Sequence, residues 1–234
     1  MLTTIIVICV VSFALIAGAL WGVYGNLSNK TEGFLVALAG GALMVSAVLE
    51  LIQPALENEP IITPLIAVFT GAIVFTILDF YVKEKWSTSS GGSGLLAAIT
   101  LDGLPENLAL GVALISADPL TVAALSGSIV LSNLPEAAGG AKEMKADGRS
   151  SKSIIWLWTA TAIVLSIAAL VGYFFFDKVS NDTLDLIRCF AGGAVVASLA
   201  IEVFPKAFKE DKYWTGLATA IGLVLAFYLN TLGG

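Results

Sequence analysis

Residues 33–56 have the sequence GFLVALAGGALMVSAVLELIQPAL, which contains one acidic residue, Glu50, and no basic residue. A helix of about 20 apolar residues is long enough to cross the hydrocarbon core of a bilayer. The run does not alternate polar and apolar residues as the strands of a membrane barrel do, and open sheet edges cannot satisfy their backbone groups in lipid. The run therefore predicts a membrane-spanning helix.

Seven further runs of this kind are separated by charges, Pro and Gly. The eight runs are residues 2–24, 33–56, 61–82, 94–116, 120–141, 153–176, 184–205 and 213–232. Of all residues, 57% are hydrophobic and 13% are charged, against about 45–50% and about 25% in soluble domains. The sequence predicts an all-α protein whose residues 1–234 form a single transmembrane domain of eight helices.

Two segments need a separate interpretation. The first run has no Lys or Arg before its apolar stretch and is long enough to span, which favours a membrane helix over a signal peptide. Residues 87–94 are rich in Ser and Gly and predict a short flexible loop without chemistry of its own.

Part of the second run recurs in the seventh. AGGALMVSAVLE at 39–50 matches AGGAVVASLAIE at 191–202, an offset of 152 residues. Ala39, Ser46 and Glu50 lie at i, i+7 and i+11, on one helical face. Because the two copies are five positions apart in the order of the helices, with four helices between them, the second enters the membrane from the opposite side. This predicts an inverted repeat of helices 1–3 and 6–8 around helices 4 and 5, a pattern typical of secondary transporters.

The repeated glycines alone would also fit a close-packing face between membrane helices. The aligned glutamates, Glu50 and Glu202, favour a functional role, since a charge inside the membrane is costly.

Lys and Arg gather in alternate loops. Ten lie in the odd-numbered loops, and only Lys178 and Arg188 lie in or next to the even-numbered loops. Positive residues are retained on the cytoplasmic side. We therefore expect both termini outside, in a multi-pass protein of the plasma membrane.

Composition excludes several classes of function. A net charge of -6 and a pI near 4.6 argue against nucleic-acid binding. Cys9 and Cys189 lie in apolar runs without a CxxC spacing, which predicts neither a disulfide framework nor a thiolate metal site. Histidine is absent, and the HExxH, Ser–His and GxGD patterns of intramembrane proteases are missing as well. We expect no enzyme activity and no bound cofactor, and an intramembrane hydrolase is the weakest alternative.

Two further runs carry paired polar residues beside a proline. Asp102 and Glu106 lie four residues apart on one helix face, with Pro105 between them. The next run contains Ser132, Asn133, Leu134, Pro135 and Glu136 in succession. Each proline removes a backbone donor and frees a carbonyl group within the membrane. Such a cluster of oxygens is suited to hold a cation, although acids that share a proton would explain the same pattern.

These segments, DGLPENLALG at 102–111 and SNLPEAAGG at 132–140, resemble the fourth- and fifth-helix signatures of the Zrt/Irt-like (ZIP) metal transporters. The resemblance implies a transporter domain of eight helices with outside termini that moves zinc or another divalent metal. It implies metal-ligand roles for Asp102, where the family usually has His, and for Glu106. It implies the same for Ser132, Asn133 and Glu136. Gly103 stands where the family has Asn, and the sixth run offers no acidic residue for a second adjacent metal.

Oxygen ligands in place of imidazole favour harder ions such as manganese, iron(II) or magnesium. We expect Glu50 and Glu202 to bind the metal transiently on either side of the central site, as acidic rings do in cation pores. Pairing of Glu202 with Lys206 at i+4 is the structural alternative. The expected partners are divalent metal ions and the lipid bilayer, and a homodimer is left open. A proton- or sodium-coupled carrier of a small organic solute remains the alternative function, and a larger cavity would favour it.

Overall fold

The computed structural model describes residues 2–86, 92–115, 119–176 and 178–233. Within the helices, this description leaves out the side chains of residues 85, 86, 92–99, 102, 119–122, 124, 232 and 233. About 90% of the described residues are helical, and none of them forms a strand.

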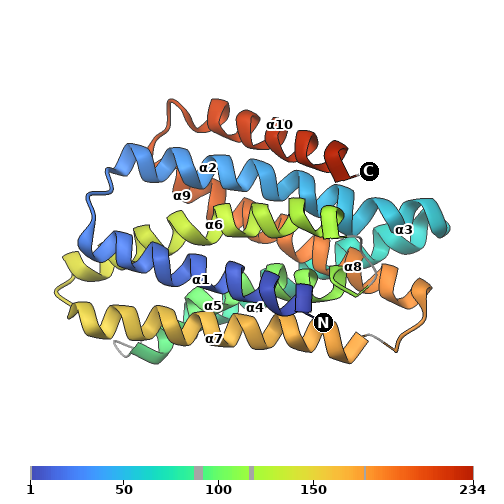
Figure 1. Ribbon diagram of the computed structural model, residues 1–234, viewed down its shortest axis with the longest axis horizontal. Helices are drawn as coiled ribbons and strands as arrows, with labels where there is room; N and C mark the ends of the chain where they lie inside the picture. The colour runs from blue at the N-terminus through green and yellow to red at the C-terminus, as the bar shows by residue number, and fades with distance from the viewer. Residues whose placement is uncertain (1, 87–91, 116–118, 177, 234) are drawn as a thin grey trace.

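The described residues form eight helical rods that run side by side, each corresponding to one of the predicted runs (Figure 1). Six are single helices: α1 (Leu2–Tyr24), α4 (Ile62–Trp86), α5 (Gly92–Ala113), α6 (Pro119–Ala146), α7 (Ser151–Phe176) and α10 (Thr215–Gly233). The other two pass through a π-helical turn: α2 (Asn29–Ser46), η1 (Ala47–Ile52) and α3 (Gln53–Asn58), then α8 (Asn181–Ser198), η2 (Leu199–Val203) and α9 (Phe204–Glu210).

The boundaries of the rods differ from the predicted ones by a few residues. The second rod begins at Asn29 rather than 33, because the Ser28 hydroxyl caps it by accepting a hydrogen bond from the Thr31 amide. The predicted loop at 87–94 is shorter than expected, since α5 already begins at Gly92, and residues 87–91 lie outside the described residues.

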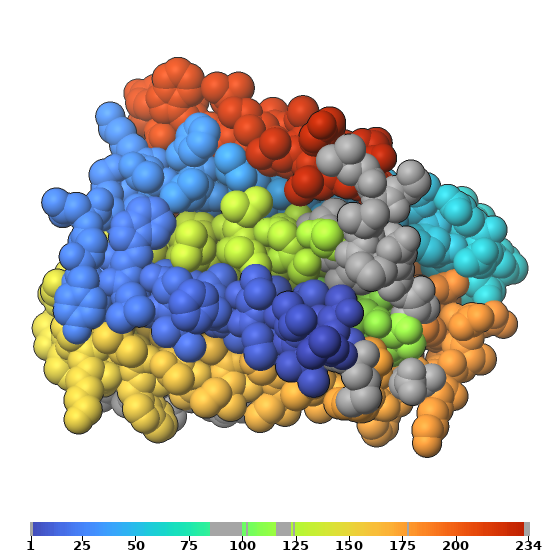
Figure 2. All heavy atoms as spheres, in the orientation of Figure 1, coloured from blue at the N-terminus to red at the C-terminus, as the bar shows by residue number. Residues whose placement is uncertain are grey.

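Five rods are long and apolar enough to cross a membrane, counted over the described residues. They are Leu2–Tyr24, Asn29–Asn58, Ile62–Glu84, Ser151–Phe176 and Asn181–Glu210, and Thr215–Thr231 is a shorter apolar helix. Large apolar side chains such as Phe69, Trp156 and Phe175 point outward from them. Figure 2 shows α1, α2, α7 and α10 covering one face of the molecule, with α6 visible between α1 and α2. The protein is embedded in a membrane.

The two termini lie at the same end of the bundle (Figure 1). The loops that follow α1, α6 and α9 lie at the opposite end, which we call the loop end. These loops and the adjoining helix ends carry most of the basic residues counted in the sequence.

The helix–π-turn–helix series recurs at the offset of the sequence repeat. The π-turns begin at Ala47 and Leu199, which are 152 residues apart. The main packing partners correspond as well. The packing of α2 on α10 corresponds to that of α8 on α4. The packing of α1 on α6 corresponds to that of α7 on α5.

The second glycine of each repeated pair lies where two backbones meet. A Cβ at Gly41 would come within 2.1 Å of the Thr219 carbonyl oxygen in α10, and a Cβ at Gly193 within 1.9 Å of the Val68 carbonyl oxygen in α4. Only a residue without a side chain permits this approach. These glycines therefore have the close-packing role that the sequence left open.

We expect Gly193→Ala to lower the free energy of unfolding by about 1–3 kcal/mol, because the methyl group forces α4 and α8 apart. Thermal unfolding of the purified protein in detergent measures the change. Gly127→Ala is the matched control, since nothing lies within 4 Å of a Cβ at that helical position. Equal unfolding temperatures of the two variants would contradict the assigned role.

An apolar cluster fills the half of the bundle nearer the termini. It joins Val11 of α1, Leu51 of η1, Leu110 of α5, Leu125 of α6 and Val195 of α8, all of them buried. Val11 and Leu125 belong to the first halves of helices that start at the terminal end. This half of the bundle is closed by packed aliphatic side chains.

Candidate functional site

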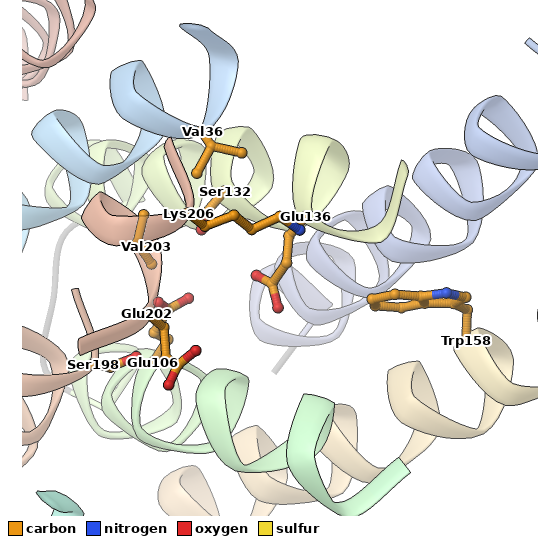
Figure 3. A pocket seen from close by; sticks show the side chains of 9 residues that line it. All are labelled: Val36, Glu106, Ser132, Glu136, Trp158, Ser198, Glu202, Val203 and Lys206. Atoms are coloured by element: carbon orange, nitrogen blue, oxygen red, sulfur yellow. The ribbon is translucent and has the colours of Figure 1, made fainter. Parts of the chain in front are cut away.

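A cavity of about 170 Å³ lies between α2, α5, α6, α7 and the η2–α9 segment (Figure 3). Its walls provide three carboxylates, two hydroxyls and one ammonium group. The lining residues are Val36, Glu106, Ser132, Glu136, Trp158, Ser198, Glu202, Val203 and Lys206. Such a lining is rare inside a membrane, because each charge must be compensated there.

Two intrahelical prolines precede the glutamates that face each other across the cavity. Pro105 lies inside α5 directly before Glu106, and Pro135 lies inside α6 directly before Glu136. Each proline leaves a carbonyl one turn back without its usual helical partner. Nearby, the Asn107 side chain donates a hydrogen bond of 2.9 Å to the Gly103 carbonyl.

The carboxylates form two groups in the cavity. In Figure 3, Glu106 and Glu202 lie together beside Ser198, and Glu136 lies across from them beside the end of the Lys206 side chain. Among the described side chains, no three Asp, Glu or Cys residues are close enough to hold one metal ion together. In this conformation the predicted ligands share a cavity without being gathered around a point.

Four predicted site residues line this cavity: Glu106, Ser132, Glu136 and Glu202. Asn133 is absent from the lining, because its side chain is buried and donates a hydrogen bond of 3.3 Å to the Val11 carbonyl of α1. The side chain of Asp102 lies outside the described residues.

Gly103, which replaces the usual Asn of the resembled family, lies against α7. A Cβ there would come within 2.6 Å of Leu165 Cδ1. The position serves helix packing.

Glu202 is paired with a lysine, although not with Lys206 at i+4. Its carboxylate contacts the ammonium group of Lys83 from α4, which also binds Asp79 at 3.0 Å. The structural alternative weighed for Glu202 was therefore wrong about the partner, since Lys206 extends to Glu32 instead.

Glu32 is a buried acid that the sequence analysis missed. Its side chain is 2% exposed and lies 3.1 Å from Lys142 Nζ and 3.7 Å from Lys206 Nζ, so it ties α2 to α6 and α9. The lack of a side chain at Gly139 makes room for the Glu32 carboxylate, because a Cβ there would fall 1.9 Å from Glu32 Oε1. Glu32 and Lys142 each adjoin the end of a predicted run and were assigned to loops. A search for opposite charges at the ends of neighbouring runs would have found them.

Glu50 lies away from the cavity, in the apolar cluster. It is 7% exposed and faces the Leu125 amide and the Ser46 hydroxyl, but neither carboxylate oxygen makes a hydrogen bond of good geometry. The Ser46 hydroxyl is 3.0 Å from that of Ser128. The two repeat-related glutamates thus occupy different surroundings.

Neither the protein-family models nor the curated proteins with which the sequence was compared match this chain.

Proposed function

We propose that this protein moves a divalent metal cation across the membrane through the cavity between α5 and α6. The observation that carries the proposal is that Glu106, Glu136 and Glu202 line one small cavity inside a membrane-embedded bundle. Carboxylate and hydroxyl oxygens are the ligands that hard divalent ions prefer.

The charge around the cavity supports a dication as cargo. The described groups that line the cavity, together with those joined to its lining by ion pairs either directly or through one further residue, are the carboxylates of Asp79, Glu32, Glu106, Glu136 and Glu202 and the ammonium groups of Lys83, Lys142 and Lys206. With every one of them ionised, their net charge is -2. One divalent ion would neutralise it.

We infer an inverted repeat in which α1–α4 and α7–α10 surround α5 and α6. The matching π-turns and the reciprocal glycine contacts support this arrangement. Inverted repeats permit alternating access, because each half can adopt the conformation of the other. The cavity lies toward the loop end, while the apolar cluster fills the terminal end. With both termini outside a plasma membrane, this conformation would open inward.

The size of the cavity favours an ion over an organic solute. Ligand pockets for drug-sized molecules measure about 300–1,000 Å³, whereas this cavity measures about 170 Å³. A volume of this size has room for a partly hydrated ion and a few water molecules.

Competitive uptake tests the proposal. We expect proteoliposomes containing the protein to accumulate Mn²⁺ in response to a metal gradient, with Zn²⁺, Fe²⁺ and Mg²⁺ competing to different degrees. The order of competition identifies the cargo: a preference for Zn²⁺ would follow the ZIP resemblance, and a preference for Mn²⁺ or Fe²⁺ would follow the oxygen ligands. Uptake equal to that of protein-free liposomes for every metal would reject the proposal.

We expect Glu50→Gln and Glu202→Gln each to slow uptake several-fold at low metal concentration, because each removes an attractive charge from the path of the cation. The measurement is flux from each side of oriented vesicles at matched protein levels. Glu143→Gln, an exposed glutamate near the end of α6, is the control. Wild-type flux in both variants would show that the two glutamates are structural.

A further inference from the structure

Lys206 belongs to two charged groups at once. It extends from α9 and lines the cavity beside Glu136, as Figure 3 shows, and its ammonium group also lies 3.7 Å from Glu32. Its charge interacts with the Glu136 carboxylate. Lys206 therefore lies between the Glu136 carboxylate, which lines the cavity, and the Glu32 carboxylate, which does not.

Glu32 does not depend on Lys206 alone. Lys142 lies closer to it, at 3.1 Å, and forms a hydrogen bond with its second carboxylate oxygen. Lys142 is not among the residues that line the cavity. The Lys206 charge is consequently available to Glu136 while Glu32 keeps a partner of its own.

We propose that the Lys206 ammonium group is a tethered competitor for the cation site at Glu136, and that it makes the cavity selective for divalent over monovalent cations. This inference rests on the proposed function and names a residue that determines its specificity.

The physical basis is the difference between a tethered and a free charge. A group held by a short flexible chain has an effective concentration in the millimolar range or above. A free monovalent ion carries the same charge without this advantage in concentration, so it does not readily displace the ammonium group. A divalent ion interacts about twice as strongly with the same carboxylate. It can displace the ammonium group, which then remains paired with Glu32.

Metal binding to the full-length protein in nanodiscs tests this inference. Titrations with Mn²⁺ and with Zn²⁺ are made in choline chloride and in sodium chloride of equal ionic strength. For the wild type we expect the same dissociation constant in both salts. For Lys206→Met we expect metal affinity in choline to rise by about tenfold or more, because a neighbouring positive charge is removed. We also expect sodium to weaken binding by that variant several-fold.

Three further variants make the result specific. Lys209→Met removes a charge three residues away on an exposed position of the same helix and should behave like the wild type. Lys206→Arg keeps the charge and should remain insensitive to sodium. In Glu136→Gln/Lys206→Met the sodium effect should disappear, because the carboxylate that sodium would occupy is gone.

The inference would be overturned if Lys206→Met had the same metal affinity as Lys209→Met and were equally insensitive to sodium. It would also be overturned if Lys206→Met lost metal binding while Lys206→Arg retained it. The first result would make Lys206 irrelevant to the site, and the second would make it a structural support. Failure of the proposed function looks different: the wild type itself would then bind neither Mn²⁺ nor Zn²⁺. Lys206→Gln, measured in parallel, serves if the Met variant does not fold.

Discussion

Glu106→Gln is expected to abolish metal uptake while leaving the protein folded. The Glu106 side chain is 4% exposed and faces the cavity from α5. An amide keeps its size but loses the charge that offsets a dication. At contact distance one unit charge is worth several kcal/mol even at an effective dielectric constant of about 20, so uptake should fall by at least about 100-fold.

Initial rates of Mn²⁺ uptake into proteoliposomes measure this loss, and thermal unfolding in detergent verifies the fold. Glu143→Gln is the control, because this glutamate is exposed and does not line the cavity. Undiminished uptake by Glu106→Gln would remove Glu106 from the transport path.

Glu32→Gln is expected to lower the free energy of unfolding. It leaves Lys142 and Lys206 without the carboxylate that they share. Breaking a buried pair costs about 3–5 kcal/mol, and the partial exposure of both lysines reduces this to about 2 kcal/mol. The free energy of unfolding in detergent gives the change.

A second substitution distinguishes charge from packing in this cluster. Glu32→Gln/Lys142→Met should recover part of the lost stability, because one of the two uncompensated charges is removed. A Glu32→Gln protein that unfolds like the wild type would show that the cluster contributes little to the fold.

The apolar runs predicted the rods well, because the length of an apolar run is a local property of the sequence. The proline–glutamate pairs were also visible locally, and Glu106 and Glu136 do line one cavity. Asn133 shows the limit of such reasoning. Its neighbours in the sequence suggest a metal ligand, yet its position on α6 turns it toward the backbone of α1.

The repeat misled in a similar way. Glu50 and Glu202 are equivalent in sequence, but the helices packed beside them are not. Lys83 near the end of α4 compensates Glu202, whereas residues 230–233 at the end of α10 have no charged side chain. Glu32 escaped notice because the predicted runs were cut at charged residues. Which charges meet depends on which helices touch, and a single sequence does not contain that information.

The central claim is that one divalent cation binds between the proline–glutamate turns of α5 and α6. Anomalous scattering from crystals of the full-length protein soaked in Mn²⁺ tests it directly. The account predicts one strong peak in the cavity, at about 2.2 Å from carboxylate oxygens of Glu106 and Glu136, and its loss in Glu106→Gln. A peak outside the cavity, or a cavity without a peak at saturating Mn²⁺ while the metal binds elsewhere, would contradict it.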